Sequence, residues 1–136
     1  MTMQLNPETG EYTPVIRLGW PELFDAITGA GALEVYPWYV SHKFSLTCGD
    51  RTGYGSGNRC AVVMDTGETT PAGATLLARK VLTPAHLRRT IVKMLLDDHP
   101  LVTTVDWGDP YCDTDVDADI ADCIMQTAIL GEVVFG

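Results

Sequence analysis

Apolar residues recur at helical spacing in three stretches of the chain, which are 21–28, 84–98 and 115–130. Thr83 and Pro84 fit the start of the second helix, because Thr is a good N-cap and Pro is tolerated in the first turn. Five residues of the last two helices are expected to be buried: Leu87, Ile91, Leu95, Ile120 and Ile124.

Alternating and β-branched apolar residues predict three strands, over 33–48, 59–65 and 74–82. Pro37 cannot donate a ladder hydrogen bond, so the first strand is expected at a sheet edge or with a bulge. Residues 132–136 are expected to form either a last short strand or a packed segment.

The order of these elements is α-β-β-β-α-α-(β), after an extended N-terminal arm over 1–19. Strands in one run with most helices after them are typical of an antiparallel sheet covered on one face. The predicted fold is therefore α+β, with an antiparallel sheet of three to four strands and three helices. The 136 residues can form one hydrophobic core, and we expect a single domain over 1–136.

Charge is distributed unevenly along the chain, whose formal net charge is −9. Residues 1–93 hold nine Lys and Arg against eight acids, whereas 94–136 hold ten acids and neither Lys nor Arg. One surface is expected to carry a strong negative potential, which either binds a partner or only keeps the protein soluble. Direct binding of nucleic acid is not expected, because nucleic-acid affinity depends on basic residues.

The strongest local signal is a run of carboxylates around the start of the last helix: Asp113, Asp115, Asp117, Asp119 and Asp122. Helix capping is the simplest interpretation, because a helix N-terminus carries partial positive charge; a partner-binding acidic face and a divalent-metal site are the alternatives. An EF-hand loop beginning at Asp113 would have Ala118 where Gly is needed and Ile124 where a bidentate Glu is needed, so no metal site is predicted. Asp119 and Asp122 would lie beyond the first turn, so replacing both with Asn is expected to leave melting nearly unchanged and to slow association with a partner.

Two loops carry aromatic side chains of the kind that anchor binding partners. Trp107 and Tyr111 lie among acidic residues and are candidate binding residues, although large aromatics in loops also fold back onto a core. The glycine-rich segment 49–58 offers Arg51 and Tyr54 as further candidates, with a mobile hairpin tip as the alternative. That segment lacks the Gly-Lys-Ser/Thr of a phosphate-binding loop and precedes a strand rather than a helix, so we expect no nucleotide site.

Cysteine and histidine positions form no catalytic or zinc-binding motif. The four cysteines are not spaced as Cys-x-x-Cys, and Cys60 and Cys123 fit small core positions. Nothing in the sequence brings His42, His86 or His99 to a cysteine. We expect a protein that is not an enzyme and uses no metal or cofactor; an enzyme with a Cys/His pair or a divalent metal is the alternative.

The chain has no apolar run near the ~18–20 residues that a membrane span needs. Its first residues show neither the basic start nor the apolar core of a signal peptide. A cytoplasmic location with reduced thiols and no membrane partner is therefore expected.

Residues 113–136 combine an Asp-rich start, an Asp–aliphatic–Gln helix and the ending Gly-Glu-Val-Val-Phe-Gly. In these features the segment resembles the ending of small accessory proteins encoded by bacteriophages of actinobacteria, and a weaker likeness covers 31–40 and 81–89. The resemblance implies a phage or prophage origin and carries no catalytic residue. We expect a non-enzymatic accessory protein that binds a host or phage protein in the host cytoplasm, with the acidic face as its candidate surface. A nucleic-acid mimic, whose carboxylates imitate phosphates, is the alternative within binding proteins.

Overall fold

The computed structural model describes residues 3–46 and 58–136. Its central element is an antiparallel sheet in the order β3-β4-β5, formed by Tyr39–Leu46, Asn58–Thr69 and Thr75–Leu82. Each strand pairs with its neighbour in the sequence, as hairpin connections require. The predicted antiparallel run of three strands is confirmed.

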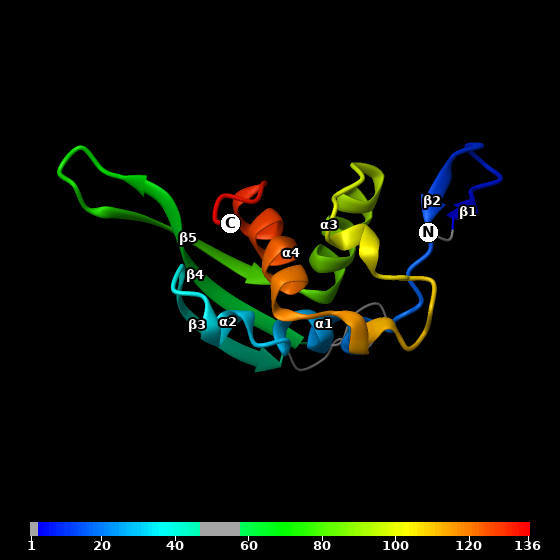
Figure 1. Cartoon of the computed structure of the whole chain (residues 1–136), viewed down its shortest axis with the longest axis horizontal. Coiled ribbons are helices and arrows are strands. Elements are labelled where there is room, and N and C mark those ends of the chain that lie inside the picture. Colours follow the sequence, from blue (N-terminus) through cyan, green and yellow to red (C-terminus); the bar gives the residue numbers. More distant parts are fainter. Residues whose placement is uncertain (1–2, 47–57) are drawn as a thin grey trace.

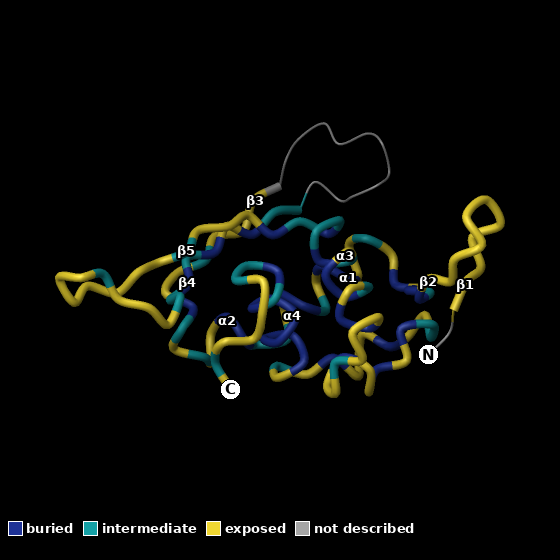
Figure 2. The backbone as a smooth tube through the Cα atoms, turned by 90° about the horizontal axis from the view of Figure 1, so that it is seen from above, coloured by how far each residue is buried: buried dark blue, intermediate teal, exposed yellow. Residues whose placement is uncertain are grey.

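The helices lie on one face of this sheet (Figure 1). They are α1 (Trp20–Thr28), α2 (Ala32–Val35), α3 (Pro84–Leu96) and α4 (Ala118–Leu130). The view from above shows that most buried residues lie where the helices and the sheet face each other (Figure 2). The arrangement is the predicted α+β fold. No helix in the described part of the chain is long and apolar enough to cross a membrane.

The core lies between this helical layer and the inner face of the sheet. Alternate residues of β4 point inward because successive side chains of a strand face opposite sides, and these are Cys60, Val62 and Met64. All five residues expected to be buried lie in this core: Leu87, Ile91, Leu95, Ile120 and Ile124. Full burial of one Leu or Ile side chain stabilises a fold by about 1.5–3 kcal/mol.

The N-terminal segment is partly the exposed arm that the sequence predicts. Its first part forms a hairpin of β1 (Met3–Leu5) and β2 (Tyr12–Pro14) around the Asn6–Pro7 turn. The arm prediction is wrong for Ile16 and Leu18, which are buried in the core.

Arg88 of α3 binds the backbone of the N-terminal segment. Its guanidinium donates to the carbonyl oxygens of Ile16 at 2.6 Å and of Leu18 at 3.3 Å. The same group lies 5.3 Å from the centre of the Trp20 ring, which is the geometry of a cation–π contact. Burial lowers the pKa of Arg88. A guanidinium has several N–H donors and a flat face, so Arg88 can donate to two carbonyls and also stack on an aromatic ring.

The first predicted strand, over 33–48, is wrong at its beginning. Gly31 has a φ of +97°, which lets the chain turn sharply after α1. Residues Ala32–Val35 then form the short helix α2, and the strand starts only at Tyr39. Pro37 lies between the two elements, because it can continue neither a helix nor a ladder.

Other boundaries differ by a few residues. The third predicted helix begins at Ala118 rather than 115, since the 3-10 helix η2 (Cys112–Asp115) precedes it. The helix α3 ends at Leu96, and Asp98 follows it with a φ of +54°. Residues 132–136 form no strand and are instead a packed segment, one of the two expected outcomes. The hairpin between β4 and β5 projects beyond the helices (Figure 1).

Candidate functional site

The acidic segment between α3 and α4 is shaped by its own carboxylates. Asp106 accepts a hydrogen bond from the backbone N–H of Gly108 at 3.2 Å, and Asp109 accepts one from Tyr111 at 2.9 Å. Such bonds from Asp to a backbone N–H two residues later close tight turns. Two carboxylates of this segment are therefore held in turns of the loop.

Asp117 is the N-cap of α4, as the capping interpretation expects for this group of residues. Its side chain accepts from the backbone N–H of Ile120 at 2.9 Å, and its backbone is extended rather than helical. A cap of this kind stabilises a helix by about 0.5–2 kcal/mol.

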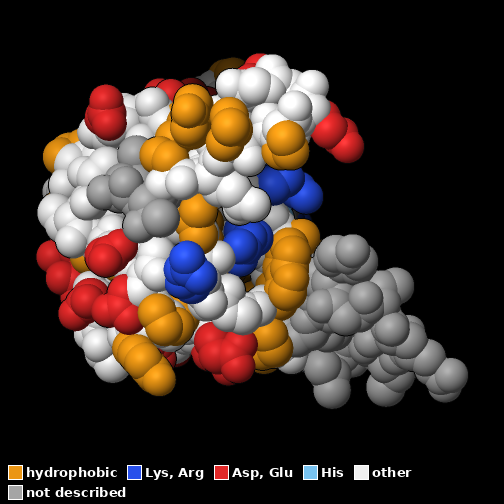
Figure 3. Space-filling view, turned by 90° about the vertical axis from the view of Figure 1, so that its right-hand side faces the viewer, with side chains coloured by type: hydrophobic (Ala, Val, Ile, Leu, Met, Phe, Trp, Pro, Cys, Tyr) orange, Lys and Arg blue, Asp and Glu red, His pale blue; other side chains and the backbone are white. Residues whose placement is uncertain are grey.

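Asp113 and Asp115 lie on η2, apart from the helix that they were expected to cap. Both are exposed, and neither side chain makes a hydrogen bond or ion pair with any described residue. Their charges therefore face solvent without a partner among the described residues. Figure 3 looks at the end of the molecule that the 101–117 segment crosses, and Asp and Glu side chains gather along the left-hand side of this face.

The two candidate aromatic residues of this segment have opposite environments. Trp107 is buried, and its Nε1 donates to the carbonyl oxygen of Val102 at 2.9 Å, so it belongs to the core. Tyr111 is 76% exposed and immediately precedes η2. Of the two, only Tyr111 is placed to contact a partner. Arg51 and Tyr54 lie outside the described residues.

Asp119 and Asp122 do not share one solvated face. Asp119 lies in the first turn of α4, so the expectation that it lies beyond that turn is wrong; it is exposed and accepts a hydrogen bond from the Tyr36 hydroxyl. Asp122 is only 5% exposed, which makes the expectation of a solvated Asp122 wrong. The helix α4 turns this position toward the sheet, four residues before the fully buried Gln126.

The buried carboxylate of Asp122 joins α4 to the start of β3. One oxygen accepts from Trp38 Nε1 at 2.9 Å and from the Tyr39 hydroxyl, and the other accepts from Gln126 Nε2 at 2.8 Å. Burial raises the pKa of Tyr39, and the hydrogen bond to Asp122 raises it further, so Tyr39 stays a donor.

Gln126 extends this network to the C-terminal segment. Its Oε1 accepts from the backbone N–H groups of Val134 and Phe135, and its Nε2 donates to the carbonyl oxygen of Phe135. The Phe135 ring consequently stacks on Trp38, with 5.0 Å between ring centres. The residue pattern alone does not predict this network; the Asp122–Gln126 spacing of four residues within an apolar helix is the only sign of it in the sequence.

A cavity of about 430 Å³ lies beside this network. Trp38, Asp122, Cys123 and Phe135 line it together with His99, whose Nδ1 accepts from the backbone N–H groups of residues 101 and 102. Because the carboxylate of Asp122 and the Nδ1 of His99 already have partners, their role here is structural.

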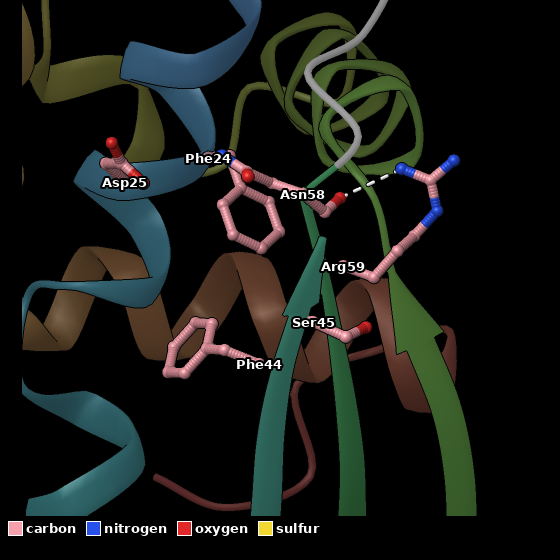
Figure 4. A pocket seen from close by; sticks show the side chains of 6 residues that line it. All are labelled: Phe24, Asp25, Phe44, Ser45, Asn58 and Arg59. Atoms are coloured by element: carbon pink, nitrogen blue, oxygen red, sulfur yellow. Dashed lines mark hydrogen bonds between the residues drawn. The ribbon is translucent and has the colours of Figure 1, made fainter. Parts of the chain in front are cut away.

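Figure 4 shows a second cavity, of about 350 Å³, at the end of the sheet. The rings of Phe24 and Phe44 meet edge to face with centres 6.3 Å apart on one side of it. Arg59 turns its guanidinium toward the carbonyl oxygen of Asn58, which accepts from it at 2.9 Å. The chain on either side of this cavity leads into residues that are not described.

The described cysteines provide no activated nucleophile. Cys60, Cys112 and Cys123 are buried and unpaired. Burial raises the pKa of Cys60 and of Cys112 to about 11, and burial with nearby carboxylates raises that of Cys123. A raised pKa disfavours the thiolate that nucleophilic catalysis needs. Within 3–46 and 58–136, no group of three or more His, Cys, Asp or Glu residues is arranged to hold a metal ion.

No protein-family model, curated protein or solved structure matches this chain.

Proposed function

We propose that the protein is a non-enzymatic accessory protein of a phage or prophage, which acts in the host cytoplasm by binding a host or phage protein. Its binding surface is the acidic surface, defined here as Tyr111, Asp113 and Asp115 with the exposed Asp119. The presentation of Asp113 and Asp115 without any partner among the described residues is the observation that supports this proposal most.

Charge at this surface supports binding to a basic partner. No Lys or Arg occurs from residue 94 to the end of the chain, so the segment itself supplies no compensating charge. Exposed charges of one sign speed the encounter with a surface of the opposite sign, and this effect weakens as salt increases.

Tyr111 provides the apolar contact that charge alone cannot provide. Exposed tyrosines are frequent energetic centres of protein interfaces, because a rigid ring buries a large area and its hydroxyl still forms a hydrogen bond. The 3-10 helix η2 starts directly after Tyr111 and carries both Asp113 and Asp115.

The environments of the three described thiols favour this proposal over the enzyme alternative. Their raised pKa values disfavour a thiolate at neutral pH, and the carboxylate of Asp122 is engaged by three donors. The buried thiols fill space in the core, and the carboxylate of Asp122 is satisfied by its hydrogen bonds.

Affinity capture from host lysate tests the proposal, with the bound proteins identified by mass spectrometry. The wild-type protein should retain a basic partner at about 50 mM salt and lose most of it at about 500 mM. The double variant Asp113→Asn/Asp115→Asn and the variant Tyr111→Ala should each retain much less at low salt.

The matched control is Glu8→Gln/Glu11→Gln, which changes the net charge equally at two exposed positions of the N-terminal segment. It should capture as the wild type does. Equal capture by all variants would contradict the proposed surface. Release of the partner by added duplex DNA would identify the partner as a nucleic-acid-binding protein and support the mimic.

A further inference from the structure

The strand β5 is an edge of the main sheet with no strand on its outer side in the described chain. It pairs with β4 from Cys60↔Leu82 to Thr69↔Thr75 and has no second neighbour in the sheet order β3-β4-β5 (Figure 1). The strand has eight residues, and its first seven are exposed or half-buried. A row of backbone N–H and C=O groups of this length can pair with another extended chain.

Cations stand on both sides of this edge. Register places Arg79 opposite Val63 on the outer face of the sheet and Lys80 opposite the buried Val62 on the inner face. Both cationic side chains are exposed. Val81 is 51% exposed and lies on the outer face with Arg79, where it offers an apolar contact.

The helix α3 continues the positive charge on the inner side. His86, Arg89 and Lys93 line a cavity of about 290 Å³ together with two threonines of α3 and α4. Burial lowers the pKa of His86, and the charges of Lys80 and Arg89 lower it further. A cation of β5 and a cation of α3 are thus both close enough to act on the same side chain.

These cations have no salt-bridge partner among the described residues, although acids outnumber Lys and Arg by eighteen to nine. Charged side chains on an edge strand also protect it from pairing with a second copy. Pairing of β5 with β5 of another copy would bring Arg79 and Lys80 close to their equivalents, and like charges facing each other across a sheet are destabilising. The charge therefore selects against a second copy and in favour of an acidic chain.

We propose that β5 binds an extended acidic segment of a partner protein by strand addition, with acidic side chains meeting Arg79 on the outer face and Lys80, Arg89 and Lys93 on the inner face. Backbone pairing supplies the contact that does not depend on sequence, and the cations select for acidic side chains. This surface is separate from the acidic surface, so the protein can join a basic and an acidic partner.

A fluorescein-labelled ten-residue peptide with the repeat Glu-Glu-Val-Val is the probe, because as a strand it presents Glu on both of its faces. Fluorescence anisotropy should show saturable binding to the full chain, and a Lys–Val peptide of the same length should not bind. The variant Arg79→Gln/Lys80→Gln should weaken binding by about tenfold, as expected for the loss of two charge contacts at a partly desolvated interface. The control Arg17→Gln/Lys43→Gln changes two other exposed cations and should bind as the wild type does.

Hydrogen exchange separates strand addition from simple attraction of charges. The bound Glu–Val peptide should slow exchange of backbone amides in β5, and the same peptide with N-methylated amides should bind weakly and protect none. If Arg79→Gln/Lys80→Gln is unstable, Arg89→Gln/Lys93→Gln on α3 replaces it, and its melting temperature shows that it is folded. Absence of binding, equal binding by the variants and the wild type, or protection elsewhere than in β5 would overturn the proposal.

Discussion

Replacement of Asp122 by Ala should destabilise the protein more than a change at any exposed aspartate. The substitution removes the acceptor of three hydrogen bonds, and leaves Trp38 Nε1, the Tyr39 hydroxyl and Gln126 Nε2 without it. A hydrogen bond to a charged group is worth about 1.5–3 kcal/mol, and such values within one network are not additive.

We therefore expect a loss of about 3–5 kcal/mol in the free energy of unfolding, out of a total of about 5–15 kcal/mol for a domain. At about 4 °C for each kcal/mol, the melting temperature should fall by roughly 12–20 °C. Asp122→Asn should cost less, about 1–2 kcal/mol, because its oxygen still accepts from Trp38 while its amide faces the donor of Gln126.

Urea unfolding followed by circular dichroism measures these changes, since Trp38 fluorescence itself responds to the mutation. The matched control is Asp119→Asn, which affects an exposed acceptor and should stay within about 0.5 kcal/mol of the wild type. A free energy for Asp122→Ala within about 1 kcal/mol of the wild type would refute the structural role assigned to the network.

Three further changes test other parts of the fold. Arg88→Ala should cost about 2 kcal/mol in urea unfolding, because it loses two carbonyl partners and the ring of Trp20; a cost below about 0.5 kcal/mol would contradict the stabilising role of these Arg88 contacts. Gly131→Ala should cost about 1 kcal/mol, since this residue ends α4 with a φ of +85°; equal melting temperatures would disprove the strain. Stability should fall as pH rises from about 9 to 11 in reducing buffer, because the fold raises the pKa of the Cys60 and Cys112 thiols from 9.0 to about 11. The unfolded chain then releases these protons at lower pH than the folded one, so a urea midpoint that stays constant or rises over this range would contradict the thiol environments.

Local signals in the sequence predicted the parts of the fold that local chemistry determines. Thr83 and Pro84 start α3 as expected, and the Thr83 side chain accepts from the N–H of His86 at 3.1 Å. Aromatic and β-branched residues predict a strand over 33–38, but Ala32–Val35 form α2 and bury Ala32 and Leu33 in the core. Strand propensity alone does not distinguish these two outcomes.

The acidic residues show the same limit at the candidate site. Alternation in the sequence suggested one group, yet the fold separates Asp113 and Asp115 on η2 from the cap Asp117 and the buried Asp122. The burial of Asp122 depends on donors that lie more than eighty residues away, at Trp38 and Tyr39. Contacts of such sequence separation arise only from the tertiary fold.

The association rate between the protein and its captured partner tests the central proposal, the binding role of the acidic surface, most directly. Stopped-flow mixing at about 50 mM and about 500 mM salt should show a rate constant that falls several-fold as salt rises, because exposed charges are screened beyond about 10 Å at 0.1 M. Asp113→Asn/Asp115→Asn should associate several-fold more slowly at low salt and approach the wild type at high salt, while Glu8→Gln/Glu11→Gln follows the wild type throughout. Equal association rates for Asp113→Asn/Asp115→Asn and the wild type at both salt concentrations would contradict a binding role for the acidic surface.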